Sequence, residues 1–191
     1  MKIAIIGNGN VGSGLAKALS GISHDVAAYG READIGAAVA SADIVILATP
    51  YEAAADLATK ADYAGKIVVD VSNPVSEDFS GLQVGHDSSA AEEIAAALSG
   101  ARVVKAFNTV FAQHYGGDLK LGETPIQTFV ASDDDDAKET VKALAVEAGL
   151  DALDAGPLKN ARYLEPLGFL NIQFGYVLGK GTEIAPRWQT A

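Results

Sequence analysis

The sequence predicts an α/β protein with a Rossmann-type, doubly wound and mostly parallel sheet that ends in a short C-terminal helical extension. Three observations predict this fold. Short β-branched runs alternate with alanine-rich segments of helical periodicity. A glycine-rich turn, Gly7–Gly12, follows the first run and leads directly into the first helical segment. The third run, residues 43–48, is almost entirely apolar, as expected for a strand covered on both faces.

The expected elements alternate along the chain. We predict strands at residues 2–6, 26–29, 43–48, 66–71, 102–107, 127–131 and 151–154. We predict helices at residues 11–19, 35–42, 51–60, 90–98, 133–148 and 160–178. Ser89 and Glu92 have the spacing of a capping box, and Ser132 is expected to cap the helix that follows it. We therefore expect a nucleotide-binding domain at residues 1–155 and a helical extension at residues 156–191 that packs on it.

The composition is that of a globular protein. The chain has 191 residues, of which 49% are hydrophobic and 20% charged, so it can bury the core of one domain. The absence of cysteine excludes disulfides and thiolate metal sites. The net charge of −11 disfavours a nucleic-acid partner. We expect a cytoplasmic protein without membrane contact, because cleavage of a leader would remove the glycine turn and no apolar run reaches about 20 residues.

The glycine turn has the G-x-G-x-x-G spacing of a dinucleotide-binding loop. Gly7 allows the tight turn, Gly9 lets a pyrophosphate approach the backbone, and Gly12 lets the helix pack on the strand. The free N–H groups at the start of the helix then face the anion. An incidental glycine-rich turn is the alternative, and the strand before and helix after the turn disfavour it. The expected cofactor contacts are Gly7, Asn8, Gly9, Asn10, Val11 and Gly12.

The end of the second strand favours NADP over NAD. An NAD enzyme usually has an acidic residue here that binds the ribose 2′-hydroxyl. This chain has Gly30 and Arg31 at this position, and a guanidinium binds a 2′-phosphate in a fork. In the alternative interpretation Glu32 binds the ribose and Arg31 is a solvated surface charge.

Other strand ends face the same crevice in this fold. The third strand ends at Thr49 and Pro50, although Pro50 also suits the first position of the next helix. The fourth strand is followed by Asn73, and the fifth by Asn108, Thr109 and Val110. We expect these residues to contact the cofactor, mainly around the nicotinamide. The run 133–136 is four aspartates, which suit the first turn of a helix better than a metal site.

Several motifs together resemble a known family. They occur in the order Gly7-Asn8-Gly9-Asn10-Val11-Gly12, Gly30-Arg31, Val71-Ser72-Asn73-Pro74, Lys105-Ala106-Phe107-Asn108-Thr109 and Asp154-Ala155-Gly156-Pro157-Leu158. The chain resembles the NADPH-dependent deazaflavin (coenzyme F420) reductases and is similar to the cytosolic domain of the six-transmembrane metalloreductases. The resemblance implies NADP along the strand ends, with its nicotinamide near Asn108, Thr109 and Val110 and a flat redox ring against it.

The chain departs from the deazaflavin reductases at two positions. Gly30 stands where those enzymes have a serine before the arginine, so one phosphate contact is absent. Asn108 stands where they can have histidine, and it matches the metalloreductase pattern instead. The resemblance therefore implies the donor, NADPH, more firmly than the acceptor.

The predicted activity is hydride transfer between NADP(H) and a flat redox cofactor, which is coenzyme F420, FMN or FAD. This chemistry needs alignment of two rings and exclusion of water, so we expect no catalytic side chain. An anionic acceptor tail has Lys105, Lys159 and Arg162 as candidate contacts, with plain surface charge as the alternative, and a lone His114 is more often structural. A pyrroline-carboxylate-type imine or carbonyl reductase and a non-catalytic NADP sensor are the alternative functions.

The last helix carries a stripe of apolar residues at helical spacing, and part of it is a candidate homodimer interface. Its members are Tyr163, Leu164, Leu167, Leu170, Phe174, Val177 and Leu178.

Overall fold

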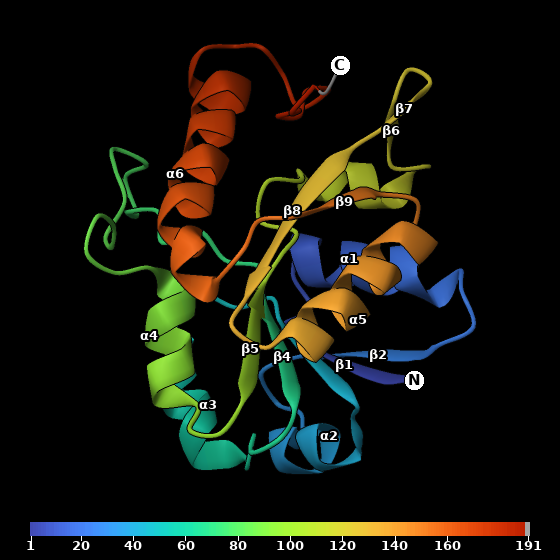
Figure 1. The fold of residues 1–191 in the computed structure, drawn as a ribbon, viewed down its shortest axis with the longest axis vertical. Coiled ribbons are helices and arrows are strands. Elements are labelled where there is room, and N and C mark those ends of the chain that lie inside the picture. Colours follow the sequence, from blue (N-terminus) through green and yellow to red (C-terminus); the bar gives the residue numbers. More distant parts are fainter. Residues whose placement is uncertain (190–191) are drawn as a thin grey trace.

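The computed structural model describes residues 1–189 and confirms the predicted fold class (Figure 1). A seven-stranded sheet has the order β2-β1-β3-β4-β5-β8-β9. Its strands are β1 (Lys2–Ile6), β2 (Asp25–Tyr29), β3 (Ile44–Leu47), β4 (Ile67–Asp70), β5 (Arg102–Lys105), β8 (Gln127–Ser132) and β9 (Asp151–Asp154). The helices are α1 (Asn10–Ser20), α2 (Ile35–Ser41), α3 (Ala54–Lys60), α4 (Ala90–Ala97), α5 (Asp135–Glu147) and α6 (Ala161–Ile172).

The strand order contains a switch point at β1. Strands β1 to β5 pair in parallel, β8 is antiparallel to β5, and β9 is parallel to β8. The chain builds β2 on one side of β1 and then crosses to build β3 on the other side. Ligands of doubly wound sheets bind beyond the carboxyl ends of the strands at such a point.

Helices cover both faces of the sheet and bury a separate core on each (Figure 1). On one face α1 and α5 pack Leu15 and Leu144 against Ile5 and Val104. On the other face α2, α3 and α4 pack against the alternate residues of the same strands, including Val45 and Val68. Since β1, β3 and β4 are buried on both faces, their almost unbroken apolar sequences follow directly.

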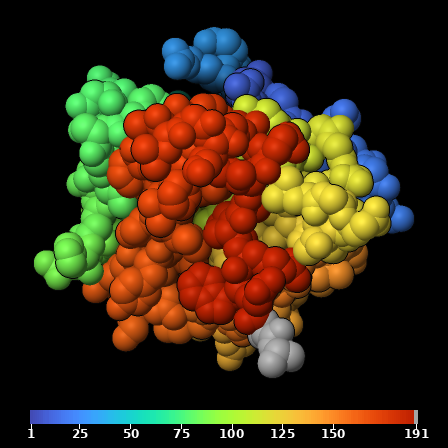
Figure 2. Space-filling model, turned by 90° about the horizontal axis from the view of Figure 1, so that it is seen from above, coloured from blue at the N-terminus to red at the C-terminus, as the bar shows by residue number. Residues whose placement is uncertain are grey.

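The C-terminal helix packs on β8 and beside α4. Leu164 of α6 contacts Phe129 and Ala131 of β8. A π-helical turn, Gln173–Val177, continues α6, so the expected helix at 160–178 is present with a different geometry in its last part. Seen from above, α6 and the segment after it border a hollow (Figure 2), where a cavity of about 290 Å³ is lined by Leu167, Leu170, Asn171, Phe174, Lys180, Ile184, Ala185 and Pro186.

Two predicted boundaries are wrong, and in both places the residue concerned bonds to a distant part of the chain. Ser132 does not cap the fifth helix, because α5 begins only at Asp135 and Asp134 is its N-cap, accepting from the Ala137 N–H. The Ser132 hydroxyl donates to the Val103 carbonyl (2.7 Å) and accepts from the Asp134 N–H (3.2 Å). Strand β5 ends before Phe107, which has a positive φ of 64° and donates its N–H to the Thr128 hydroxyl. The β6–β7 hairpin (Lys120–Leu121 and Thr124–Pro125) and a 3-10 helix at Ala112–Gly116 were not predicted.

Candidate nucleotide-binding site

Two glycines of the turn after β1 are required by close backbone packing. Gly7 has a φ of +110°, and a Cβ there would lie 2.3 Å from the Ala48 carbonyl oxygen. A Cβ on Gly12 would lie 1.9 Å from the Gly7 carbonyl oxygen. The turn, α1 and the end of β3 therefore pack so closely that neither glycine can be replaced without moving backbone.

Gly9 differs from both, because a Cβ at this position would meet nothing within 4 Å. It is exposed and forms the N-cap of α1 without any side-chain cap, and the first turn contains no acidic residue. Asn10 and Val11 begin the helix, whose first N–H groups have no partner within it. The open space above Gly9 thus faces unpaired donors at the positive end of a helix, which is an arrangement that binds anions.

A cavity of about 480 Å³, here called the switch-point cavity, opens beside this turn. It has an apolar floor and brings together predicted residues from three strand ends. Those predicted residues are Gly7, Asn8, Gly9, Gly30, Arg31, Thr49 and Pro50. The floor is Ile6, Ile35, Ala48, Ala53 and Leu57. The volume lies within the range of pockets for small organic ligands, about 300–1,000 Å³.

Gly30 leaves room for the side chain of Asn8. A Cβ on Gly30 would lie 2.8 Å from the side-chain nitrogen of Asn8. The Asn8 amide occupies this space, so a serine could fit only if that amide moved.

Arg31 is an exposed cation on the rim of the cavity. Within residues 1–189 its guanidinium makes no hydrogen bond or ion pair. Its neighbour Glu32 is also exposed but does not line the cavity. The other charged residues at the cavity, Asp56 and Lys60, pair with each other at 2.6 Å. Among the described residues, Arg31 is therefore a cation without a partner at the rim of the cavity.

The residues expected around the nicotinamide form a second group, largely below the surface. Asn73 and Asn108, here called the asparagine pair, exchange two hydrogen bonds: Asn73 Nδ2 donates to the Asn108 carbonyl (2.8 Å) and Asn108 Nδ2 donates to Asn73 Oδ1 (2.9 Å). Asn73 is partly exposed, whereas Asn108, Thr109 and Val110 are 7%, 2% and 8% exposed. Of this group, Asn73 presents the most surface to a ligand.

Lys105 cannot receive an acceptor tail, and this expectation is corrected. Its side chain is completely buried, and its ammonium pairs with Asp70 (2.6 Å) and Glu165 (2.8 Å). We call Asp70, Lys105 and Glu165 the buried ionic cluster. Burial raises the pKa of Glu165 even though the Lys105 ammonium opposes the shift. Removing one partner of such a cluster typically costs about 3–5 kcal/mol, because a buried charge loses its partner.

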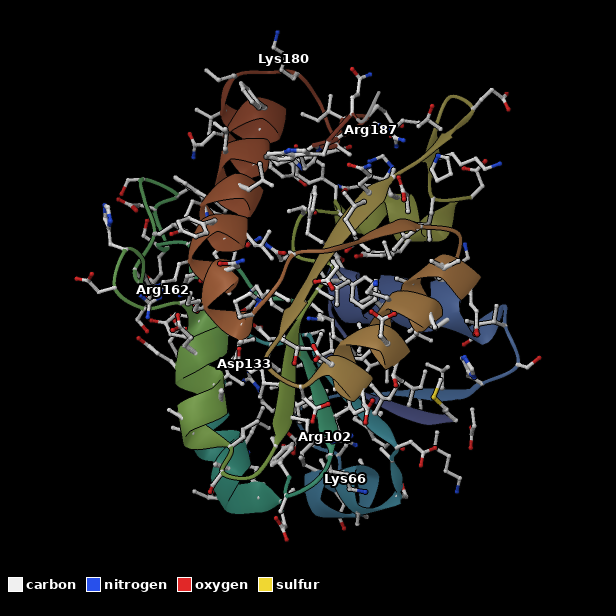
Figure 3. All side chains as sticks on the ribbon, in the orientation of Figure 1. Lys66, Arg102, Asp133, Arg162, Lys180 and Arg187 are labelled. Carbon is white, nitrogen blue, oxygen red and sulfur yellow. The ribbon has the colours of Figure 1, made fainter. Side chains whose placement is uncertain are left out.

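The other polar candidates have different surroundings. Arg162 lies where α6 meets α4 (Figure 3) and holds Glu92 through two nitrogens, at 2.8 and 2.7 Å. His114 is buried, with Nε2 2.8 Å from the Thr182 carbonyl oxygen, so its contact is structural. Lys159 is exposed and stays a candidate contact.

Sequence reasoning missed Glu165, which stands among apolar residues of α6. Its carboxylate accepts from the Ala90 N–H (2.9 Å) and the Ala91 N–H (3.2 Å) and so binds the start of α4. One signal was available at the strand ends. Asp70 is the last residue of β4 and Lys105 the last residue of β5, and the two are paired across these neighbouring strands. A buried lysine beside one aspartate suggests a further polar partner.

Among the described residues, no helix is long and apolar enough to cross a membrane.

Comparisons with known proteins agree with the fold. Residues 27–74 match the family model described as NADP oxidoreductase coenzyme F420-dependent. The chain is 32% identical over 181 residues to metalloreductase STEAP3 of Rattus norvegicus; the match covers 87% of this chain but only 36% of that protein.

Two solved structures are similar over most of their length. One is a candidate F420-dependent NADP-reductase from Arthrobacter sp. FB24, with a TM-score of 0.80, 26% identity and coverage of 91% of this chain and 92% of that one. The other is hypothetical protein SMa0349 of Sinorhizobium meliloti, with a TM-score of 0.72, 30% identity and coverage of 83% and 86%. Residues 27–74 and the overall fold therefore resemble those of the NADP oxidoreductases described as coenzyme F420-dependent.

Proposed function

We propose that the protein binds NADP(H) at the switch-point cavity and transfers hydride between it and a flat redox cofactor. The observation that carries the proposal is the Arg31 guanidinium, which has no partner among residues 1–189, on the rim of a cavity that also contains the glycine turn. The apolar floor suits the adenine, the start of α1 suits the pyrophosphate, and Arg31 suits the 2′-phosphate.

The nicotinamide half extends in this proposal from Thr49 and Pro50 toward the asparagine pair. NADPH supplies the hydride when bound. The chain binds both ends of the cofactor, orients the nicotinamide and excludes water, and none of these tasks requires an acid or base. Asn171 lines the apolar cavity beside α6 and donates to the Thr109 carbonyl (3.1 Å), so we place the acceptor ring there.

The test is NADPH oxidation by the purified protein, followed by absorbance. Separate samples contain coenzyme F420, FMN, FAD, a cyclic imine or no acceptor, and NADH serves as the control donor. Turnover with F420, FMN or FAD, faster with NADPH than with NADH, is the expected result. Turnover with the imine alone would favour the imine-reductase function. Binding without turnover on any acceptor would favour an NADP sensor, and no binding would contradict the proposal.

We also propose that the exposed side of the C-terminal helix forms a homodimer contact. Of the predicted stripe, Leu170 and Phe174 line the apolar cavity instead, whereas Tyr163 (72% exposed), Val177 (60%) and Leu178 (61%) lie outside its lining. An exposed stripe of this kind is typical of a protein–protein contact, and two copies of one helix can pair about a two-fold axis.

Val177→Glu is expected to weaken this dimer by about tenfold or more, because pairing would bury an unpaired carboxylate. Sedimentation velocity over a concentration series measures the change. Val146→Glu is the matched control, since Val146 is 59% exposed on α5, away from the stripe. A monomeric wild-type protein, or an equal effect of both variants, would contradict the dimer.

A further inference from the structure

The buried ionic cluster makes no contact with the switch-point cavity. Asp70 and Lys105 are 0% exposed and Glu165 is 1% exposed, so the cluster is no ligand site in this structure. Replacing a buried ionic cluster by apolar residues is often neutral or stabilising, so stability alone does not account for it.

Hydrogen bonds connect the buried ionic cluster to the residue that precedes Asn73 of the asparagine pair. Besides its two carboxylate partners, the Lys105 ammonium donates to the Ser72 carbonyl oxygen at 2.5 Å. Asp70 holds the same residue from its other side, by accepting from the Ser72 N–H at 2.9 Å. Ser72 immediately precedes Asn73, so the cluster fixes the backbone from which the exposed member of the pair projects.

The second member of the pair is fixed from α6. Asn108 Nδ2 donates to the Leu164 carbonyl (2.8 Å), next to Glu165 in the chain. One turn further along α6, a Cβ on Gly168 would lie 2.5 Å from Asn73 Oδ1, so the helix packs directly on the Asn73 amide. A displacement of α6 would therefore move both asparagines.

We propose that the buried ionic cluster is a positioning device for the nicotinamide half of the site. Glu165 anchors α6 to Lys105 and to the start of α4, and Lys105 holds Ser72, so the asparagine pair keeps one fixed geometry. The inference rests on the proposed NADP(H) function and adds Asp70, Lys105 and Glu165 as positioning residues.

The test compares two ligands that share the adenosine half. Adenosine 2′,5′-bisphosphate engages only the switch-point cavity, whereas NADPH also engages the asparagine pair. Calorimetry of Glu165→Gln, which keeps the shape of the side chain but faces the Ala90 and Ala91 N–H groups with an amide, is expected to show NADPH weakened about tenfold and the bisphosphate changed by less than about twofold. Glu93→Gln is the matched control on the exposed side of α4, and it is expected to change neither.

The contradicting outcomes are separate. The folded Glu165→Gln variant could melt at a lower temperature and bind both ligands like the wild type, or its affinity for both ligands could fall by the same factor. Either result would mean that the cluster is only structural. If the wild type binds the bisphosphate and NADPH with equal affinity, the nicotinamide half makes no contact to position. If it binds neither ligand, the proposed function fails and this inference fails with it.

If the Glu165→Gln variant does not fold, a measurement on the wild-type protein tests the same proposal. Hydrogen exchange at Ala90 and Ala91, whose N–H groups bind Glu165, is expected to slow more with NADPH than with the bisphosphate. Equal slowing by both ligands would overturn the proposal.

Discussion

Gly12→Ala is expected to lower the free energy of unfolding by more than about 3 kcal/mol, because its methyl group would overlap backbone and not a movable side chain. The new Cβ would lie 1.9 Å from the Gly7 carbonyl oxygen and 3.3 Å from the Ala48 Cβ. Relief requires α1 to move away from β1 and β3, which opens the core around Leu15. Equilibrium urea unfolding measures the loss through the midpoint.

Gly9→Ala, three residues earlier in the same turn, is the matched variant and is expected to behave in the opposite way. A Cβ there meets nothing within 4 Å, and the φ of −70° is one that alanine adopts. Its stability should change by less than about 1 kcal/mol, while NADPH binding should weaken by about tenfold or more, because the methyl group occupies the approach of the pyrophosphate. A Gly12→Ala variant as stable as the wild type would contradict the packing role of Gly12. A Gly9→Ala variant that binds NADPH like the wild type would contradict the role of Gly9 in pyrophosphate binding.

Features with local causes were predictable from the sequence. The two-sided burial of β3 follows from its apolar run, and the tight turn after β1 follows from Gly7. The Ser89–Glu92 box caps α4 as expected, with the Glu92 N–H donating to the Ser89 hydroxyl. In each case the residues that give the signal lie within a few positions of one another, so a short stretch of sequence was enough to predict the feature.

Features formed by distant residues were not predictable. Lys105 has the same side chain as an exposed lysine, and only its contacts with Asp70 and Glu165, 35 and 60 positions away, make it a buried group. The burial of Asn108 depends in the same way on the Leu164 carbonyl of α6. A motif identifies which residues a site contains, but the packing of α6 decides which of them a ligand can touch.

Arg31→Ala is expected to weaken NADPH binding by about 1.5–3 kcal/mol relative to its effect on NADH, as for the loss of a hydrogen bond to a charged group. Only NADPH carries the 2′-phosphate, so titration of both dinucleotides isolates this contact. The comparison is clean because Arg31 has no ion pair or hydrogen bond within residues 1–189 whose loss would add to the effect.

Glu32→Ala is the matched control for Arg31→Ala and also tests the competing interpretation. Glu32 is equally exposed but lies outside the lining of the cavity, so its removal should change neither affinity by more than about 0.5 kcal/mol. If Glu32 held the ribose hydroxyls instead, its loss would weaken NADH most and leave Arg31→Ala with equal effects on both dinucleotides. That pattern would assign the cavity to NAD, because a preference for NADPH requires a cation placed where only the 2′-phosphate reaches.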